Sequence, residues 1–373
     1  MRVFLMSIVA QILINPYIGW RGYQVLPHKP LLRKSFLALF FIEIALYFLG
    51  YFFYKNLPDA IFLPIFHLCG TWYIFILYIG IGFLLLEPFR LSRRIRQKIY
   101  PFIVIGVIGL LVNGYHVATH PVATYHKVYL EKKAKGRDSL RISFMADLHF
   151  GEEIGRKLAE RYVALSNAQQ PDIVMLGGDL IDYESRFAEN EHIEEILQQL
   201  QSTLGTYIIL GNHEYRANWM AKRKWIRQYG TLLIDSVASP DGSFNLIGRD
   251  DYINLKRKPL QEILENINTK KPLILLDHQP STIDETLMNH IDLALYGHVH
   301  QGQLWPNSWL VKLWWRFSYG MHKLGNTFIY VTSGIGFAGP PYRIGTQGEL
   351  AVIDVYFGRK AACIKTKCRF KDK

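Results

Sequence analysis

The sequence is poor in cysteine and in charge, and each shortage excludes a broad class of protein. Only three of its 373 residues are Cys, which is too few for a disulfide-stabilised scaffold. Charged residues make up 20% of the chain and hydrophobic residues 50%. This excludes a disordered protein, because disordered chains combine dense charge with few apolar side chains. The net charge of +12 favours a nucleic acid or a membrane as partner.

Acidic residues are nearly absent from the first 120 residues, and this uneven distribution decides between the two partners. Residues 1–120 carry 11 Lys and Arg against three acids, whereas residues 121–373 carry 32 against 28. Most of the excess charge therefore lies in short clusters between apolar stretches. We interpret residues 1–120 as a transmembrane region with the lipid bilayer as partner. No nucleic-acid partner is expected, because the remainder of the chain is close to charge balance.

Four apolar stretches in this region approach the ~20 residues that a helix needs to cross the hydrocarbon core. They cover about residues 3–20, 36–54, 60–86 and 99–119. The first is the weakest, because Gln11, Asn15 and Pro16 interrupt it, and a signal peptide is its alternative. No small-residue cleavage site follows, which favours a retained helix. Glu43 and His67 lie inside stretches, and we expect each to bond to a neighbouring helix.

The short loops carry the orientation signal. Basic residues gather after the first and third stretches: Arg21, Lys29, Arg33, Lys34, Arg90, Arg93, Arg94, Arg96 and Lys98. Positively charged loops stay in the cytoplasm, so we expect the large C-terminal domain on the opposite, extracytoplasmic side. The basic residues between Lys127 and Arg137 oppose this orientation, because they follow the fourth stretch closely.

From residue 140 the pattern changes to short apolar runs that alternate with amphipathic helices, which is typical of an α/β domain. The runs are 140–145, 173–176, 207–210, 244–247, 273–276, 293–296, 328–331 and 350–356, and helices are expected at 155–167, 193–200, 218–229 and 260–267. We therefore predict a basic linker over 121–139, one domain over 140–358 and a basic tail over 359–373.

Five of the apolar runs are followed by Asp, Asn or His. These residues are Asp147 and His149, then Asp179, then Asn212 and His213, then His278, and finally His298 and His300. In α/β sheets the carboxyl ends of the strands are where sites are built. His and carboxylate ligands together suit Zn, Mn, Fe or Co, and their number exceeds the need of one ion. Two ions would clamp a phosphoryl group and generate hydroxide at neutral pH.

Taken singly, each of these motifs also occurs in solvated turns, but the ordered set resembles a known family. The set comprises Asp147-x-His149, Gly178-Asp179, Gly211-Asn212-His213-Glu214, His278 and Gly297-His298-x-His300. It resembles the calcineurin-like metallophosphoesterases, in particular a membrane-associated bacterial branch with cell-wall-associated phosphatases and a UDP-2,3-diacylglucosamine pyrophosphohydrolase. The resemblance implies a four-layer sandwich of two sheets flanked by helices, with two divalent metal ions, for which Mn is favoured.

The resemblance also implies a role for each motif residue. Asp147, His149 and His300 would hold one ion. Asn212, His278 and His298 would hold the other, with Asp179 bridging the two. His213 would not be a ligand but would protonate the leaving oxygen. Some pyrophosphohydrolases of another type carry Arg at the position of His213, and this chain departs from them.

Two further clusters bear on the substrate. Trp305, Trp309, Trp314 and Trp315 follow the last motif, and we interpret their segment as an aromatic flap that contacts lipid, with a buried packing loop as the alternative. Lys222, Arg223, Lys224 and Arg227 would form a solvated helix face or recruit phosphate headgroups, and the first is favoured.

The expected protein is thus a phosphoesterase in the bacterial plasma membrane. A metal-bridging hydroxide would attack a phosphate or pyrophosphate ester of a phosphorylated lipid. A soluble extracytoplasmic or nucleotide substrate, or a non-catalytic metal-binding receptor, are the alternatives.

Overall fold

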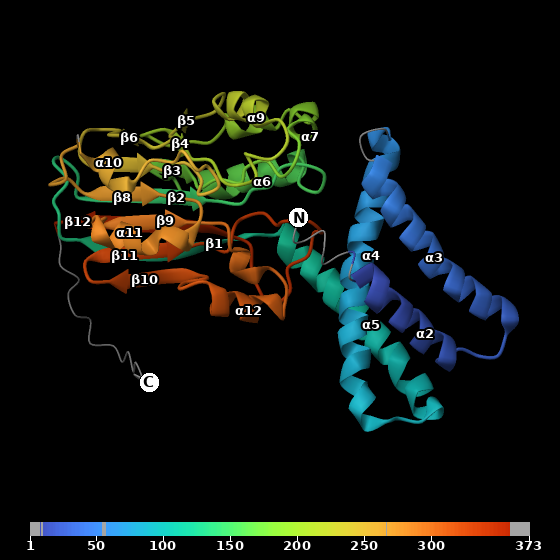
Figure 1. Ribbon diagram of the computed structural model, residues 1–373. Coiled ribbons are helices and arrows are strands. Elements are labelled where there is room, and N and C mark those ends of the chain that lie inside the picture. The colour runs from blue at the N-terminus through green and yellow to red at the C-terminus, as the bar shows by residue number, and fades with distance from the viewer. Residues whose placement is uncertain (1–7, 9, 54–56, 266, 359–373) are drawn as a thin grey trace. The chain divides into compact units, whose positions relative to one another are not determined.

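The computed structural model describes residues 8, 10–53, 57–265 and 267–358 (Figure 1). It divides into two compact units. One consists of Met1–Val117 together with Gly339–Ile344, and the other of Ala118–Ala338 together with Gly345–Lys373. A six-residue segment from late in the chain thus belongs to the first unit. The backbone amide of Arg343 donates to the carbonyl of Gly114, at 3.0 Å.

The first unit is helical. It contains a π-helix, η1 (Ala10–Ile14), then α2 (Asn15–Val25), α3 (Pro30–Phe53), α4 (Asp59–Leu86), the 3-10 turn η2 (Glu87–Phe89) and α5 (Arg93–Thr119). Among the described residues, two segments are long and apolar enough to cross a membrane: α4 with η2, and α5. They correspond to the third and fourth predicted stretches.

The other two predicted stretches are not supported in the same way. The first falls partly outside the described residues, and its described part changes from η1 to α2 at Asn15, next to Pro16. The second lies in α3, which is not among the candidate spans found in the described residues. The four-helix transmembrane region therefore remains a prediction, whereas two candidate spans are present.

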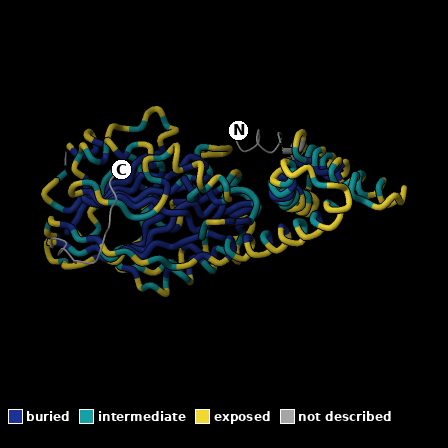
Figure 2. The backbone as a smooth tube through the Cα atoms, turned by 90° about the horizontal axis from the view of Figure 1, so that it is seen from below, coloured by how far each residue is buried: buried dark blue, intermediate teal, exposed yellow. Residues whose placement is uncertain are grey.

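Glu43 is satisfied inside the helical unit, as expected for an acid in an apolar helix. Its side chain is buried and accepts a hydrogen bond from Asn15 Nδ2 at 3.1 Å, and Asn15 Oδ1 accepts one from Trp72 Nε1 at 3.3 Å. These contacts join α2, α3 and α4. Many outward side chains of α4 and α5 are nevertheless exposed and apolar, including Leu84 and Phe102. Figure 2 shows this mixed burial along the helices, in contrast to the continuous buried core of the second unit.

The second unit is built on two six-stranded sheets. The first sheet has the order β1 (Val122–Leu130), β12 (Glu349–Phe357), β2 (Ser139–Met145), β3 (Ile173–Leu176), β4 (Thr206–Ile208) and β5 (Thr231–Leu232). The second has the order β10 (Gly320–Leu324), β11 (Thr327–Val331), β9 (Leu293–Tyr296), β8 (Leu273–Leu276), β7 (Asn245–Gly248) and β6 (Ser236–Ala238). Strands β2 to β5 run parallel, as do β7, β8, β9 and β11.

Helices and short turns connect these strands. They are α6 (Arg156–Asn167), α7 (Arg186–Asn190), α8 (Ile193–Leu197), α9 (Trp219–Ile226), α10 (Leu260–Leu264), η3 (Pro280–Thr282), α11 (Ile283–Met288), η4 (His300–Gly302) and α12 (Asn307–Trp314).

Alternation along each strand assigns its side chains to different layers. In β3, Ile173 and Met175 face the core between the sheets, whereas Val174 and Leu176 pack with residues of α6 and α8. In β8, Ile274 and Leu276 face the same central core, and Leu273 and Leu275 pack with α10 and α11. Because both faces of each sheet are apolar, each sheet must be covered on both sides. The expected sandwich of two α/β sheets is therefore present.

One strand lies in the segment predicted as a linker. β1 occupies nine residues of 121–139 and pairs in parallel with β12, from Val122 opposite Glu349 to Leu130 opposite Phe357. Val128 and Leu130 are fully buried in the central core, while Tyr129 between them is half-buried and Lys127 before them is exposed. The basic residues of this segment obscured the alternation. The edge strands β5, β6 and β10 were likewise not predicted, because they are short and only partly buried.

Candidate metal centre

The predicted site residues converge, because they follow strands whose carboxyl ends share one edge of the two sheets. Asp147 and His149 follow β2, Asp179 follows β3, Asn212 and His213 follow β4, His278 follows β8, and His298 and His300 follow β9. Seven of these eight residues are buried, and His298 is half-buried. Three groups of Asp and His among them bring potential ligand atoms within 4.8 Å of one another.

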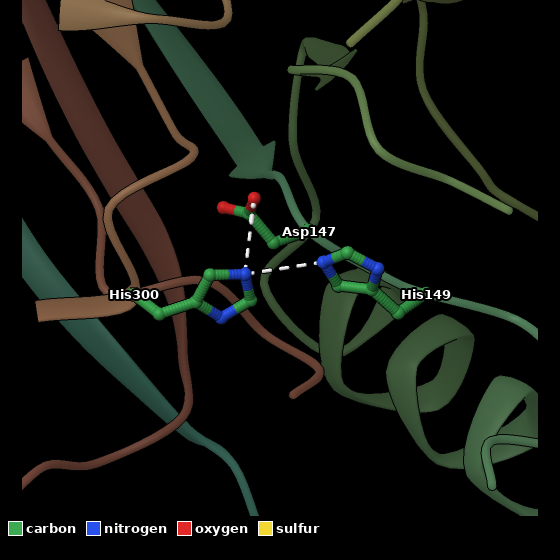
Figure 3. Close-up of side chains that lie close together, drawn as sticks. All are labelled: Asp147, His149 and His300. Carbon is green, nitrogen blue, oxygen red and sulfur yellow. Dashed lines mark hydrogen bonds and ion pairs between the residues drawn. The ribbon is translucent and has the colours of Figure 1, made fainter. Parts of the chain in front are cut away.

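Asp147, His149 and His300 form the first group (Figure 3). The Nε2 atoms of His149 and His300 lie 3.1 Å apart, and His300 Nε2 lies 3.4 Å from Asp147 Oδ1. The backbone amide of His298 donates to Asp147 Oδ1 at 3.0 Å. The Asp147 carboxylate therefore contacts both histidines of the Gly-His-x-His motif, His298 and His300. Three ligand atoms from two distant loops point to one position, as the ligands of a single ion do.

Asp179, His278 and His298 form the second group. Asp179 Oδ2 lies 3.1 Å from His278 Nε2 and 3.9 Å from the Nε2 atoms of both His149 and His213. It is thus within reach of both groups, as a bridging ligand must be. His278 Nδ1 donates to the carbonyl of Gly177 at 2.8 Å, which leaves the lone pair on Nε2 toward the site.

The donor set fits divalent transition metals. Asn212 Oδ1 is buried and has no hydrogen-bond partner in the described part of the chain. A buried amide oxygen without a partner is costly, and a cation would satisfy it. Neutral imidazole nitrogens, two carboxylates and this oxygen are the ligand types that Zn, Mn, Fe and Co accept. The seven predicted ligands thus fit a metal centre, and the structure leaves the metal's identity open.

The electrostatics keep two of the predicted ligands, Asp179 and His298, in the form that binds a cation. Burial raises the pKa of Asp179, but the neighbouring His278 and His213 outweigh burial and hold the pKa well below its usual range. Burial, reinforced by the nearby His278, lowers the pKa of His298 to about 3. Asp179 is therefore an anion and His298 a neutral imidazole near pH 7.

Five of the predicted ligands share an unfavourable backbone conformation. Asp147, His149, Asp179, His298 and His300 all have φ between 50° and 71°. This left-handed region is unfavourable for residues with a Cβ, and such outliers cluster at functional sites. Close approach also needs glycine: a Cβ on Gly211 would lie 2.3 Å from Asp179 Oδ1. The glycine before Asn212 is therefore required for the two loops to meet.

Sequence reasoning missed two carboxylates that organise the site. Asp182 Oδ1 lies 2.6 Å from His213 Nδ1 and 3.5 Å from His149 Nδ1. Burial raises the pKa of Asp182, but hydrogen bonds from both His residues outweigh it and lower the pKa far below its usual value. The spacing of Asp182, three residues after Asp179, was the available signal.

The second carboxylate is that of Glu214, which holds the loops after β3 and β4 together. Its carboxylate is buried and accepts hydrogen bonds from the backbone amides of Asp179, Leu180, Ile181 and Gly211, at 2.7 to 3.0 Å. Its place in the Gly-Asn-His-Glu motif was noted, but spacing alone assigns it no chemistry.

The tryptophan segment divides into two parts. Trp309 and Trp314 on α12 are 70% and 72% exposed, and Trp305 is 45% exposed. Trp315 is half-buried, and its ring centroid lies 5.6 Å from that of His298. The segment is therefore neither a buried loop nor uniformly exposed.

The basic cluster on α9 is not simply a solvated face. Lys222 is fully buried, and its Nζ donates to the carbonyl of His213 at 2.7 Å. The favoured interpretation is therefore wrong for Lys222, because this ammonium anchors α9 to the site loop. Lys224 and Arg227 are exposed, as expected.

Replacement of Asp179 with Asn should reduce the amount of bound metal, because it removes the carboxylate that reaches both groups. We expect at least half of the Mn retained by the wild type after dialysis to be lost, as measured by plasma mass spectrometry. Glu160→Gln, on the exposed face of α6, is the control and should retain wild-type metal. Equal metal content in all three proteins would contradict the assignment.

Comparisons with known proteins agree with this geometry. The model of the calcineurin-like phosphoesterase family matches residues 140–302. An uncharacterized metallophosphoesterase of Helicobacter pylori is 30% identical over 376 residues, covering 92% of this chain and 97% of that protein. A transmembrane protein with metallophosphoesterase domain from Danio rerio is 30% identical over 283 residues, covering 70% of this chain and 63% of that protein.

Among solved structures, TT1561 of Thermus thermophilus aligns with a TM-score of 0.35 at 12% identity, covering 53% of this chain and 89% of that chain. The relation to the Helicobacter pylori protein spans nearly the whole length of both chains. The chain therefore belongs to the calcineurin-like metallophosphoesterases, a family of dinuclear, metal-dependent phosphoric ester hydrolases.

Proposed function

We propose that the protein is anchored in the bacterial plasma membrane and hydrolyses a phosphate or pyrophosphate ester of a lipid-linked substrate on the extracytoplasmic side. The observation that carries the substrate class is the exposed aromatic helix α12, which begins a few residues after His300. The predicted ligands are Asp147, His149, Asp179, Asn212, His278, His298 and His300.

Bound metal ions would supply a nucleophilic hydroxide and neutralise the charge of the phosphoryl group. His213 supplies the proton for the leaving oxygen. Its Nδ1 donates to Asp182, which fixes the ring and leaves Nε2 toward Asp179 and the site. Burial lowers the pKa of His213, but Asp179 and Asp182 outweigh it and raise the pKa. The raised pKa favours the ring form in which Nε2 also carries a proton, as a proton donor requires.

α12 presents an apolar surface that water solvates poorly. Trp309, Leu313 and Trp314 are each at least 70% exposed, whereas Val311 on the opposite side is buried. Trp side chains in such a setting partition to the interface of a bilayer. Because Trp315 at the end of this helix packs against His298, a lipid held by α12 would have its phosphate near the metal ligands.

Chain connectivity and charge support the anchoring. Only His120 and Pro121 separate α5 from β1, so a membrane-spanning α5 would hold the phosphoesterase domain at the bilayer surface. Arg90 before α5 and Arg93, Arg94 and Arg96 at its start form a basic stretch that would lie in the cytoplasm. The phosphoesterase domain would then lie outside the cytoplasm.

His213→Ala should lower kcat for p-nitrophenyl phosphate by about 100- to 10,000-fold, the usual contribution of a general acid. Bound metal, measured in parallel, should not change, because His213 is not among the proposed ligands. His192→Ala, at an exposed site, is the control. If the metal-loaded wild type hydrolysed no phosphoester, the protein would instead be a non-catalytic metal-binding receptor.

Trp309→Ser combined with Trp314→Ser should lower kcat/KM for a lipid substrate by at least about 10-fold, because two large apolar contacts are lost. The lipid is chosen by a screen of phosphatidic acid, isoprenoid pyrophosphates and UDP-acylated sugars with Mn. Hydrolysis of p-nitrophenyl phosphate should fall far less. Met288→Ser, an exposed apolar residue of α11, is the control. Equal losses on lipid and soluble substrates would argue against lipid contact by α12.

A reporter fused to the C-terminus tests the orientation. Alkaline phosphatase, which folds only outside the cytoplasm, should be active, and green fluorescent protein, exported unfolded, should be dark. The opposite pattern would place the domain in the cytoplasm, in line with the basic residues near Lys132.

A further inference from the structure

We propose that the helical unit binds an anionic phospholipid between α2 and α3, with the phosphate on Arg33 and Arg93 and an acyl chain in the groove between the two helices. This lipid site is separate from the metal centre, because every residue that forms it belongs to the helical unit. The proposal rests on the membrane anchoring in the proposed function and uses none of the chemistry of the phosphoesterase domain.

A groove of about 390 Å³ lies between α2 and α3, within the size range of ligand pockets. Most of its lining side chains are apolar or aromatic, among them Pro16, Trp20, Leu37, Phe41 and Ile44. Asn15 also lines the groove, but its amide is bonded to Glu43 and Trp72. The groove therefore suits an apolar chain.

The groove can be reached from outside the helical unit. Trp20 on α2 and Phe41 on α3 line it and are exposed, and Ile42 next to Phe41 is exposed as well. Large apolar side chains with this exposure contact hydrocarbon when their helices lie in a membrane. An acyl chain of a surrounding lipid would therefore enter the groove directly from the bilayer.

Two arginines from different loops meet at one end of the groove. Arg33 Nη2 and Arg93 Nη2 both donate to the carbonyl oxygen of Leu26, at 3.0 and 3.1 Å. The Arg33 guanidinium also lies over the ring of Tyr23, 4.7 Å from its centroid, and Tyr23 lines the groove. The carbonyl that follows α2 thus holds both guanidinium groups beside the groove.

No acid in the described part of the chain neutralises this pair of arginines. Residues 1–120 contain three acids, of which Glu87 pairs with Arg21 and Glu43 is bonded to Asn15. The third, Asp59, begins α4 and is separated from the start of α5 by the length of that 28-residue helix, roughly 40 Å. The end of the groove therefore carries uncompensated positive charge.

His28 responds to this charge. Its Nε2 lies 2.7 Å from Arg93 Nη1, and because a guanidinium can only donate, His28 accepts through its lone pair. The positive charges of Arg33 and Arg93 lower the pKa of His28. Each guanidinium has five N–H groups and uses two of them on its described partners, so both retain N–H groups for phosphate oxygens.

An anionic phospholipid matches both parts of this site. Its phosphate carries negative charge and oxygens that fit guanidinium groups, and its acyl chain is apolar. Basic pockets between membrane helices bind such head groups. A free phosphate ion would leave the groove unused, and a neutral lipid would offer the arginines no anion. The two loops that supply the arginines are those expected in the cytoplasm, so the lipid would come from the cytoplasmic leaflet.

The double variant Arg33→Gln with Arg93→Gln tests the head-group contact. Its control is Lys34→Gln with Arg94→Gln, which removes the same charge from the two exposed neighbours. Binding of dioleoyl phosphatidylglycerol and dioleoyl phosphatidylcholine to the full chain in neutral detergent is measured by native mass spectrometry. The wild type should bind phosphatidylglycerol about 10-fold more tightly, the usual effect of charge-assisted hydrogen bonds. The tested pair should lose this preference, and the control pair should keep it.

Leu37→Trp tests the acyl-chain contact, because the larger side chain fills the groove. Leu39→Trp, at an exposed position of α3 that does not line the groove, is the control. Leu37→Trp should weaken binding of phosphatidylglycerol by about 10-fold, and Leu39→Trp should not. If the arginine variant did not fold, as judged by size-exclusion chromatography, the comparison of Leu37→Trp with Leu39→Trp would decide by itself.

Three results would overturn the lipid site: a wild type without preference for phosphatidylglycerol, equal losses in the two charge variants, or unchanged binding in Leu37→Trp. A wild-type chain recovered in the soluble fraction of the cell instead of the membrane fraction would refute the membrane anchoring itself.

Discussion

The buried carboxylate of Glu214 is the contact on which the site depends. Four backbone amides, three from the loop after β3 and one from the loop after β4, donate to its two oxygens. A buried charge costs several kcal/mol unless it is fully hydrogen-bonded, and here the hydrogen bonds come from the loops that carry Asp179 and Asn212. The same interaction that satisfies Glu214 therefore fixes the two loops at one separation, and Asp179 reaches both ligand groups as a result.

Glycine residues and strained backbone allow the remaining loops to approach the loops after β3 and β4. Gly211 allows Asp179 to approach, and Gly297 allows the β9 loop to approach Asp147, whose Oδ2 would lie 2.8 Å from an added Cβ. The left-handed residues at the site store strain that the well-packed sheets sustain. The packed core of the sandwich thus holds the site loops at its edge in their conformation. Functional loops on a rigid scaffold are a common arrangement.

Local signals in the sequence were sufficient for the central strands and for the Asp, Asn and His residues that gather at their ends. Runs such as 173–176 and 273–276 coincide with β3 and β8, because central parallel strands are apolar on both faces and end sharply. The ligands follow these ends. Asp182 was not found, because its importance comes from side-chain contacts with His213 and His149 that no spacing rule states. β1 was missed because the basic residues of 121–139, most of which follow the strand, hide its two-residue burial pattern.

The segment Gly339–Ile344 has a consequence for how the two units can be separated. It lies between β11 and β12 in sequence, yet it belongs to the helical unit, where Arg343 bonds to Gly114 and Tyr342 to Thr71. The second unit is therefore interrupted rather than simply appended after the helices. A protein cut at residue 120 would leave this segment attached to the phosphoesterase unit without Gly114 and Thr71, its partners in α5 and α4. Neither unit is therefore one continuous stretch of the sequence, and a single cut does not separate one from the other.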